Sequence, residues 1–477
     1  MPISNTLPEF GIDRGSDIPL TAQLVDQIRQ AVLAGRLKPN ARLPSTRALS
    51  LELGLSRTTV LAAFDQLIAE GYLEGRLGSG THVAAELPDS SLTVNQPPLH
   101  VIDQQHFHRE NPKPFRLGVF DSDHFPPHDE WGKLLGRIWR KPSPPDLLNS
   151  DDVFGFHPLR SSLARHLHEW RGMVVSPEQI IITGGSADAL SLIREALFTH
   201  GDRLWMEEPG YPPARKILGV NGLGIIPVPV DGGGLDVSSG RNKADDARGA
   251  FVTPPARHHP TGVTMTLGRR LELIAWARER DAIIIEDDYD SEHRYIGQPL
   301  PALLSLDSDR ILYIGSFSKV FSPVLRLGFL IVPSHRVAQF RELRETLFPA
   351  PSPLAQPALA AFIETGAFAQ HIRRMRRIHA SRRRKLIAAL APGEPNLFRI
   401  EAPPPAGLSL LLALPEGQSD THLASVLAEA DIEVHPLSTL FTKLKPRQGL
   451  ILGFSGFDET GLENSATALI KILKQSN

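Results

Sequence analysis

The sequence predicts a multidomain α/β protein, in which a small helical module ending in a hairpin precedes a large body with a mostly parallel sheet. Three observations lead to this prediction. The chain has 477 residues, too many for one ordinary hydrophobic core. Its first 85 residues show helical periodicity followed by a hairpin pattern, and after about Ile180 short apolar runs alternate with helical patterns. We therefore divide the chain into a module at 1–85, a linker at 86–113 and a body at 114–477.

The composition is that of a globular protein of the cytoplasm. The formal net charge of -2 gives no electrostatic argument for nucleic-acid binding by the chain as a whole. The absence of cysteine excludes disulfides, thiolate catalysis and cysteine-ligated metals, and it fits a reducing compartment. The sequence has no apolar run of about 18 residues and no signal pattern at its start, so we expect no membrane association.

The first module has the pattern of a winged helix-turn-helix. Apolar residues recur at helical spacing from Leu20 to Val32, and a short second helix starts near Ser45 and ends at Gly54. Ser56 is a good N-cap for a third helix. Two helices joined by a short glycine-containing turn indicate a helix-turn-helix, and residues 72–83 predict a two-stranded wing.

Positive charge is concentrated in one part of this module. Five cations lie between Arg36 and Arg57, against a single acid, Glu52. The first turn of the third helix contains Arg57, Thr58 and Thr59, where a recognition helix meets base edges. The alternative interpretation is a helical domain with a solvated basic edge.

The segment LPSTRALSLELGLSRTTVLAAFDQLIAEGYLEGRLGSGTHV is similar to the winged helix-turn-helix of GntR-type transcription regulators. The resemblance covers nearly the whole module and implies a double-stranded DNA operator as partner. The DNA-contacting positions that it implies are Arg47, Arg57, Thr58, Thr59, Arg76, Ser79 and Gly80.

Residues 86–113 are rich in Pro, Ser, Asn and Gln and lack clear periodicity. Such a composition predicts an extended linker, long enough to let the module sit away from its own body.

The body has the alternation of buried strands and helices that is typical of a parallel sheet covered on both faces. The predicted strands are QIIIT, RLWMEE, GIIPVPV, GAFVTPP, AIIIED, ILYIGS and LGFLIVP, and a smaller α/β lobe is expected beyond Leu408. Ligands in such folds bind at the carboxyl ends of the strands. The basic run at 371–385 is interpreted as the solvated face of a helix, with DNA phosphate contact as the alternative.

A lysine follows one of these strands at close range. The strand beginning at Ile311 leads into a small-residue turn and then Lys319. A lysine delivered by a buried strand must be paired or lose its proton, which is what a Schiff-base lysine requires. The alternative is a surface lysine on a loop.

Other strand ends supply companions for this lysine. A glycine-rich turn leads into Ser186 and Ala187 at a helix start, a position that can bind phosphate. Acids and Tyr289 follow AIIIE, and an acid there can hold a pyridinium nitrogen. Tyr211 can stack on a flat ring, and Arg326 can pair with a phosphate. Together these residues predict a pocket for pyridoxal 5'-phosphate (PLP).

The body resembles fold-type I aminotransferases, and the whole chain resembles the MocR/GabR subfamily of GntR regulators. The motifs VTPPARHHPTGVTM, IIEDDYDSEHRY, SFSKVFSPVLRLGFLIVP and GFSG occur in the expected order. The resemblance implies that Lys319 forms the internal aldimine with PLP, with Glu286 and Asp288 as rivals to Asp287 for the pyridine nitrogen. The residues implied to hold PLP are Ser186, Ala187, Tyr211, Asp287, Tyr289, Ser316, Lys319 and Arg326.

Three positions depart from the aminotransferase pattern. Ser150 occupies the place of a tyrosine that reaches the phosphate of the other subunit. His259 replaces an asparagine near the ring oxygen. The arginine that grips the substrate carboxylate is replaced by an apolar residue near Ile451, and Arg447 is a weak substitute. Weakened carboxylate capture argues against efficient amino-acid turnover.

The predicted function is a PLP-dependent, DNA-binding transcription regulator that senses PLP, a small amine or an amino acid. Partial aminotransferase-type chemistry without turnover is the expectation, and fold-type I bodies predict a homodimer. The rival hypothesis is a PLP-dependent aminotransferase that carries an autoregulatory DNA-binding module. A third is a scaffold that has lost PLP.

Overall fold

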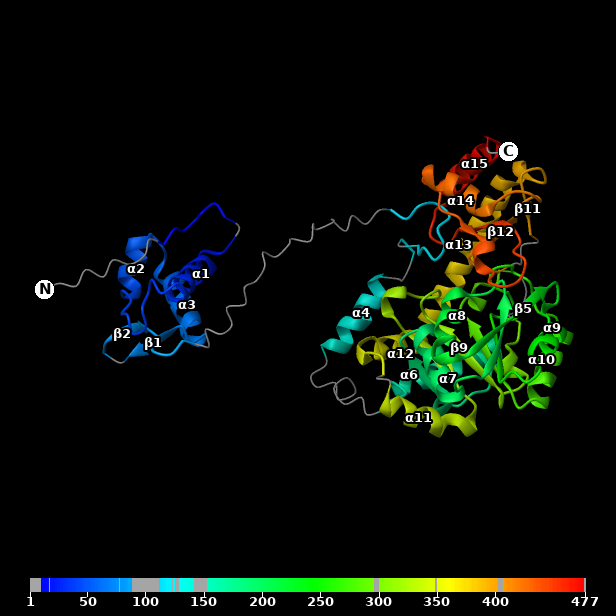
Figure 1. Ribbon diagram of the computed structural model, residues 1–477, viewed down its shortest axis with the longest axis horizontal. Coiled ribbons are helices and arrows are strands. Elements are labelled where there is room, and N and C mark those ends of the chain that lie inside the picture. Colours follow the sequence, from blue (N-terminus) through cyan, green and yellow to red (C-terminus); the bar gives the residue numbers. More distant parts are fainter. Residues whose placement is uncertain are drawn as a thin grey trace. The chain divides into compact units, whose positions relative to one another are not determined.

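The computed structural model describes residues 10–16, 18–76, 78–87, 111–121, 123–124, 128–140, 152–295, 300–347, 350–401 and 406–475. Its contacts divide the chain into two compact units, Met1–Glu110 and Asn111–Asn477, which are described separately (Figure 1). Most of the predicted linker, residues 88–110, lies outside the described part of the chain.

The first unit is a three-helix module with a two-stranded wing. The side chains of Ser45 and Ser56 cap the second and third helices by accepting main-chain N–H groups, and Gly54 ends the second helix with a φ of 64°. These starts and stops agree with the sequence predictions. The elements are α1 (Leu20–Leu33), α2 (Thr46–Leu53), α3 (Arg57–Ala69), β1 (Leu73–Arg76) and β2 (Gly80–Val83), with β1 and β2 antiparallel.

The second unit is built on a mixed sheet whose described strands run in the order β3-β10-β9-β8-β7-β4-β5-β6. From β9 to β5 neighbouring strands are parallel, while β10 is antiparallel to both β3 and β9. All seven strands predicted from the sequence are present. Their bounds are β3 (Ile180–Thr183), β4 (Arg203–Glu208), β5 (Gly224–Asp231), β6 (Gly234–Leu235), β7 (Gly249–Val252), β8 (Ile283–Asp288), β9 (Ile311–Ser316) and β10 (Gly328–Ile331).

Helices cover both faces of this sheet, as the continuous burial of its strands requires. One hydrophobic cluster packs α7 (Ser186–Leu197), α8 (Pro212–Leu218) and α11 (Val337–Thr346) against one face. A second cluster covers the opposite face. Its helices include α4 (His128–Trp139), α6 (His157–Arg171), α9 (Val237–Ala244), α10 (Leu267–Glu279) and α12 (Gln356–Glu364).

A smaller C-terminal lobe has its own antiparallel sheet, in the order β11-β12-β14-β13. Figure 1 draws this lobe in orange and red at one end of the green sheet. A separate apolar cluster forms its core. Its elements are β11 (Arg399–Ile400), β12 (Ser409–Ala413), α14 (Asp420–Glu429), β13 (His435–Pro436), β14 (Gly449–Gly453) and α15 (Glu459–Gln475).

The basic run at 371–385 forms the middle of the long helix α13 (Ala367–Leu390). Ile372 and Met375 are buried as predicted, and Ile378 is half-buried. Several of its cations hold the body together. Arg382 pairs with Asp121 at 2.7 Å, for example, and both side chains are nearly inaccessible. The interpretation of this run as a helix surface is therefore only partly correct.

Replacing Arg382 by methionine is expected to destabilise the body by about 3 kcal/mol, because the buried charge of Asp121 loses its guanidinium partner and keeps only the half-exposed His124. The measurement is the free energy of unfolding in denaturant, followed by tryptophan fluorescence. The double variant R382M/D121N is the control, since it leaves neither charge and should recover much of the loss. Equal stability of R382M and the parent would contradict the structural role of the pair.

In the part of the chain that the structure describes, we find no helix with the length and hydrophobicity needed to cross a bilayer.

Candidate functional site

The predicted PLP residues converge at the carboxyl ends of neighbouring parallel strands. Asp287 lies in β8, Ser316 ends β9, and Lys319 follows three residues later. Tyr211 follows β4, which is joined to β8 through β7. Because β4, β7, β8 and β9 all run in one direction, their ends meet at the same edge of the sheet.

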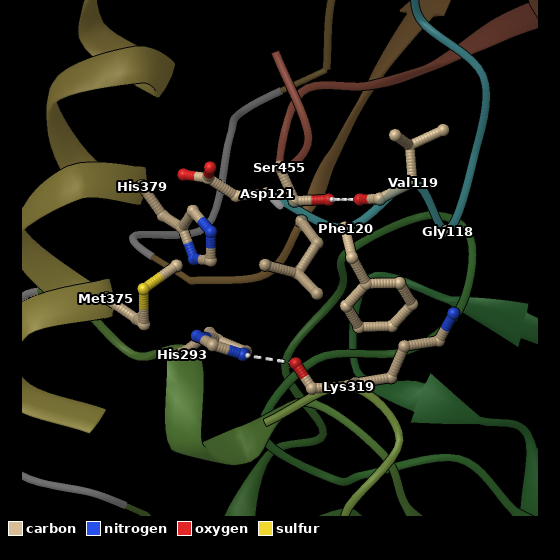
Figure 2. A pocket seen from close by; sticks show the side chains of 10 residues that line it. Gly118, Val119, Phe120, Asp121, His293, Lys319, Met375, His379 and Ser455 are labelled. Carbon is tan, nitrogen blue, oxygen red and sulfur yellow. Dashed lines mark hydrogen bonds between the residues drawn. The ribbon is translucent and has the colours of Figure 1, made fainter. Parts of the chain in front are cut away.

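Both the main chain and the amine of Lys319 have neighbours that position them. Its main-chain oxygen accepts a hydrogen bond from Nε2 of His293 at 3.2 Å, and its Nζ lies 5.4 Å from the ring centre of Phe120 (Figure 2). A Cβ placed on Gly118 would lie 3.0 Å from Nζ, and the φ of 77° at this residue favours glycine. Burial lowers the pKa of the amine, against the attraction of Asp290. A lowered pKa increases the fraction of free amine, which is the nucleophilic form.

The three consecutive acids of β8 have different surroundings. Asp288 pairs with Arg171 at 2.8 Å and accepts the hydroxyl of Tyr313 at 2.7 Å. Glu286, on the same face of the strand, accepts a main-chain N–H. Asp287 faces the other way, and its buried Oδ1 has no hydrogen-bond partner among the described residues. Burial, followed by the charge of Asp288, raises its pKa to about 7. Asp287 is thus the acid of the three that forms no side-chain hydrogen bond or ion pair with the described residues, although one oxygen of Glu286 is also without a partner.

The predicted phosphate residues surround a close approach of main chains. Gly328 of β10 pairs with the end of β3 on one side and with Ser316 on the other. A Cβ on Gly328 would meet main-chain atoms of β9 and of the turn before α7 at 2.9 and 3.1 Å. Ser186 and Ala187 open α7, whose first N–H groups receive no capping side chain. Arg326 is exposed and forms no ion pair with the described residues.

Three aromatic rings lie next to one another near these strand ends. The imidazole of His259 lies 6.1 Å from the ring of Tyr211 and 5.9 Å from that of Tyr289, edge to face in both cases. Burial lowers the pKa of His259 to about 3, helped by the charges of Arg257 and Lys319. The departure noted in the sequence therefore places a neutral imidazole between two phenol rings.

Sequence reasoning missed several residues beside the lysine. A cavity of about 330 Å³, counting its open mouth, is lined by Gly118, Phe120, Lys319 and residues of α13, among others. His293 and His379 also line it, with ring centres 5.0 Å apart. The only sign of this segment in the sequence is RLGVFD at 116–121, a short stretch without proline that follows the proline-containing linker. We find no group of His, Asp and Glu with metal-binding geometry among the described residues.

The histidine that holds Lys319 is expected to make stability depend on pH. Burial lowers the pKa of His293 to about 4, while its hydrogen bond to Lys319 opposes the shift. The unfolded chain, with an ordinary pKa near 6.5, then binds the extra proton between pH 6.5 and 4. This histidine's contribution to stability is complete above pH 6.5 and is lost as pH falls, by up to about 1.4 kcal/mol per pH unit.

The test is the free energy of unfolding of the parent and of His293→Gln at pH 7 and pH 5. Glutamine keeps a donor but does not titrate, so the advantage of the parent should shrink toward pH 5. An advantage that stays constant across this range would contradict a buried neutral imidazole.

Two of the remaining predicted positions lie away from the pocket rings. Arg447 pairs with Glu401 at the edge of the small sheet, and its side chain is about half exposed. Ile451 is fully buried with Leu411 in an apolar cluster of the C-terminal lobe. Ser150 lies outside the described residues.

The nucleic-acid interface predicted in the first unit is exposed. Arg47 and Arg57 lie in the first turns of α2 and α3, and both are solvent-accessible. The ion pairs described in this unit involve Arg29 and Arg76, so Arg47 and Arg57 remain unpaired there. Arg76 on the wing is paired with Glu74. The other predicted positions are the half-buried Thr59 and Ser79 and the exposed Thr58 and Gly80.

Comparison with known families matches both units. Residues 20–83 match the family of bacterial regulatory proteins called gntR, and residues 137–449 match aminotransferase class I and II. The solved structures with similar folds include an archaeal alanine:glyoxylate aminotransferase, with a TM-score of 0.70 and 25% identity over 77% of this chain and 92% of that one. An α-aminoadipate aminotransferase from Thermus thermophilus matches with a TM-score of 0.68, also at 25% identity, over 76% and 92%.

This combination defines a class of proteins: DNA-binding regulators with an aminotransferase-like body. A probable rhizopine catabolism regulatory protein, MocR, of Rhizobium meliloti is 36% identical over 96% of this chain and 94% of its own length. A pyridoxine biosynthesis transcriptional regulator, PdxR, of Corynebacterium glutamicum is 35% identical over 93% of each. The chain belongs to the MocR/GabR subfamily of GntR-type transcription regulators, which confirms the resemblance seen in the sequence.

Proposed function

We propose that the body binds PLP through Lys319 and that the state of this pocket controls DNA binding by the first unit. Family membership supports transcriptional regulation over the alternative of an aminotransferase with an autoregulatory module. The observation that carries the proposal is the partly buried amine of Lys319, at the strand ends where Asp287 lies unpaired.

The residues of the pocket fit PLP in three respects. An unpaired buried carboxyl, Asp287, meets the need of a pyridinium nitrogen for a negative partner. The close main-chain approach at Gly328 and the open start of α7 fit a phosphate. The phenol of Tyr289 is buried near Asp287. Burial raises the pKa of this phenol, and the charges of Asp290 and, to a smaller extent, Asp287 raise it further. A buried phenol at this position supports Tyr289 as the hydroxyl that would meet the ring oxygen of PLP.

When bound, PLP supplies an aldehyde that reacts reversibly with primary amines. The chain's own residues bind and orient it. Ser186, Ala187, Ser316 and Arg326 would hold the phosphate, and Tyr211 would stack on the ring. Lys319 supplies the amine, and the segment at Gly118 and Phe120 covers that amine from solvent.

The effector is PLP itself, a small amine or an amino acid. The apolar burial of Ile451 and the pairing of Arg447 with Glu401 leave no described cation at the usual carboxylate-gripping position. Such a pocket fits PLP or an amine without an α-carboxylate better than an ordinary amino acid. Only an effector with different affinities for two states shifts their populations.

A homodimer would place two DNA-binding units on paired half-sites. Val324, two residues before Arg326 in the chain, is 85% exposed although apolar. A second copy of the chain that packs against this loop would bury the side chain of Val324.

The decisive experiment is a gel shift of the purified protein with DNA from upstream of its own gene, with and without PLP. We expect PLP, or an amine added to the PLP-bound protein, to change the affinity for this DNA. The proposal fails if the affinity is indifferent to PLP and to every amine that perturbs the absorbance of the bound cofactor. Multiple-turnover transfer to a keto acid would instead support the enzyme.

A further inference from the structure

Arg257 is a buried cation beside the pocket that has no role in the account above. Its side chain is 4% exposed, and its guanidinium donates to Asp290 at 3.0 Å and to the main-chain oxygen of Ser409 at 3.0 Å. It also reaches the hydroxyl of Ser409 at 3.2 Å and that of Tyr289 at 3.4 Å, the longest of these contacts. A Cβ on Gly407 would overlap this guanidinium at 2.1 Å from Nε, so the chain leaves space for it.

The contact with Tyr289 fixes the direction of a hydrogen bond. A guanidinium can only donate, so the phenol oxygen of Tyr289 accepts from Arg257. The hydrogen of the same phenol must then point to a different acceptor. Oδ2 of Asp290 accepts from Arg257, and its buried Oδ1 forms no hydrogen bond with any described residue, the phenol of Tyr289 included. The pocket side of the ring is then the direction left for this hydrogen.

His259 does not donate a hydrogen bond to the phenol of Tyr289. Its ring lies 5.9 Å from that of Tyr289, edge to face, and so packs against the phenol. Burial lowers its pKa to about 3, which keeps the imidazole uncharged at neutral pH. The asparagine that usually donates near the ring oxygen is therefore replaced by a neutral packing residue, and the nearby cation is Arg257.

Asp290 links Arg257 to the lysine. Burial raises the pKa of Asp290 to about 6, and the charges of Arg257 and Lys319 both act against this rise. The two cations thus share one counter-ion. Because Arg257 forms an ion pair with Asp290, this carboxylate offsets the positive charge of Lys319 only in part.

We propose that Arg257 is a positioning residue for the ring-oxygen end of PLP: it turns the hydroxyl of Tyr289 toward the pocket and pairs with one oxygen of Asp290. This inference rests on the proposed binding of PLP. Its chemical content is that a fixed positive charge behind Tyr289 takes the place of the missing asparagine. This charge favours the deprotonated state of the hydrogen-bonded pair that the ring oxygen of PLP would form with the hydroxyl of Tyr289.

The test is the pH at which the visible absorption of bound PLP changes, measured for the parent, Arg257→Gln and Asp290→Asn. Loss of the positive charge in Arg257→Gln should raise this pH by about one unit, a tenfold change in proton affinity. Asp290→Asn leaves Arg257 without its counter-ion and should lower it. This second variant keeps the hypothesis testable should the glutamine variant not fold.

Arg270→Gln is the matched control. Arg270 is also buried and holds the same loop through the main-chain oxygens of Pro255 and Met265, but it does not touch Tyr289. It should lower the melting temperature and leave the spectral transition in place. An unmoved transition in Arg257→Gln, an equal shift in Arg270→Gln, or a rise in Asp290→Asn would overturn the inference. A parent without visible absorption in PLP would instead contradict the proposed function.

Discussion

Lys319→Ala is expected to abolish covalent attachment of PLP and the response of DNA binding to PLP, while leaving the DNA-binding unit folded. In the proposed site this amine is the nucleophile that captures the aldehyde, and no other lysine lines the described pocket. We expect the apparent affinity for PLP to fall by about 100-fold or more, equivalent to about 2.7 kcal/mol. The phosphate and ring contacts would account for the binding that remains.

The measurement is the mass of the protein after incubation with PLP and reduction with borohydride. Lys319→Arg is the control for charge, since a guanidinium is always protonated and cannot attack an aldehyde. Both variants should remain unlabelled, while Lys216→Ala, a substitution on α8, should label like the parent. Persistent labelling of Lys319→Ala at a single site would show that another lysine captures PLP.

The fold was accessible from the sequence because its signals are local. Each buried strand of the body is a short apolar run, and each predicted helix of the first unit starts at a serine cap or stops at a glycine. Lys319 and the three acids of β8 were also recognisable as a group, because parallel strand ends gather polar residues at one edge.

The choice among Glu286, Asp287 and Asp288 was not accessible from the sequence. Alternation along a strand says that Asp287 faces away from the other two, but not which face holds the pocket. The structure adds that Arg171 of α6 and Tyr313 of β9 occupy the face of Asp288, which favours Asp287.

The surroundings of Lys319 were hidden for the same reason. Gly118 and Phe120 lie far from the lysine in the chain, and His293 reaches its main chain from a turn after β8. Arg257 was passed over because a lone arginine in a loop is ordinarily solvated. Its burial depends on the space left by Gly407, in another lobe.

Arg57→Ala is expected to weaken binding to the operator by about 1–3 kcal/mol, or roughly 5- to 150-fold, if this side chain reads a base. Arg57 opens α3, where Ser56 caps the helix and engages the hydroxyls of Thr58 and Thr59. Those hydroxyls are thereby fixed, whereas Arg57 is exposed and unpaired among the described residues. Its guanidinium is free to form two hydrogen bonds with a guanine.

The measurement is the affinity of the parent and variants for operator DNA and for unrelated DNA at one salt concentration, because salt alters both. Arg57→Ala should lose more affinity for the operator than for unrelated DNA. Arg29→Ala is the matched control, since Arg29 pairs with Glu70 inside the same unit at 2.6 Å. It should change stability and leave the ratio of the two affinities intact. An equal loss on both DNAs for Arg57→Ala would assign this arginine to phosphate contact, and the sequence would then be read elsewhere on α3 or the wing.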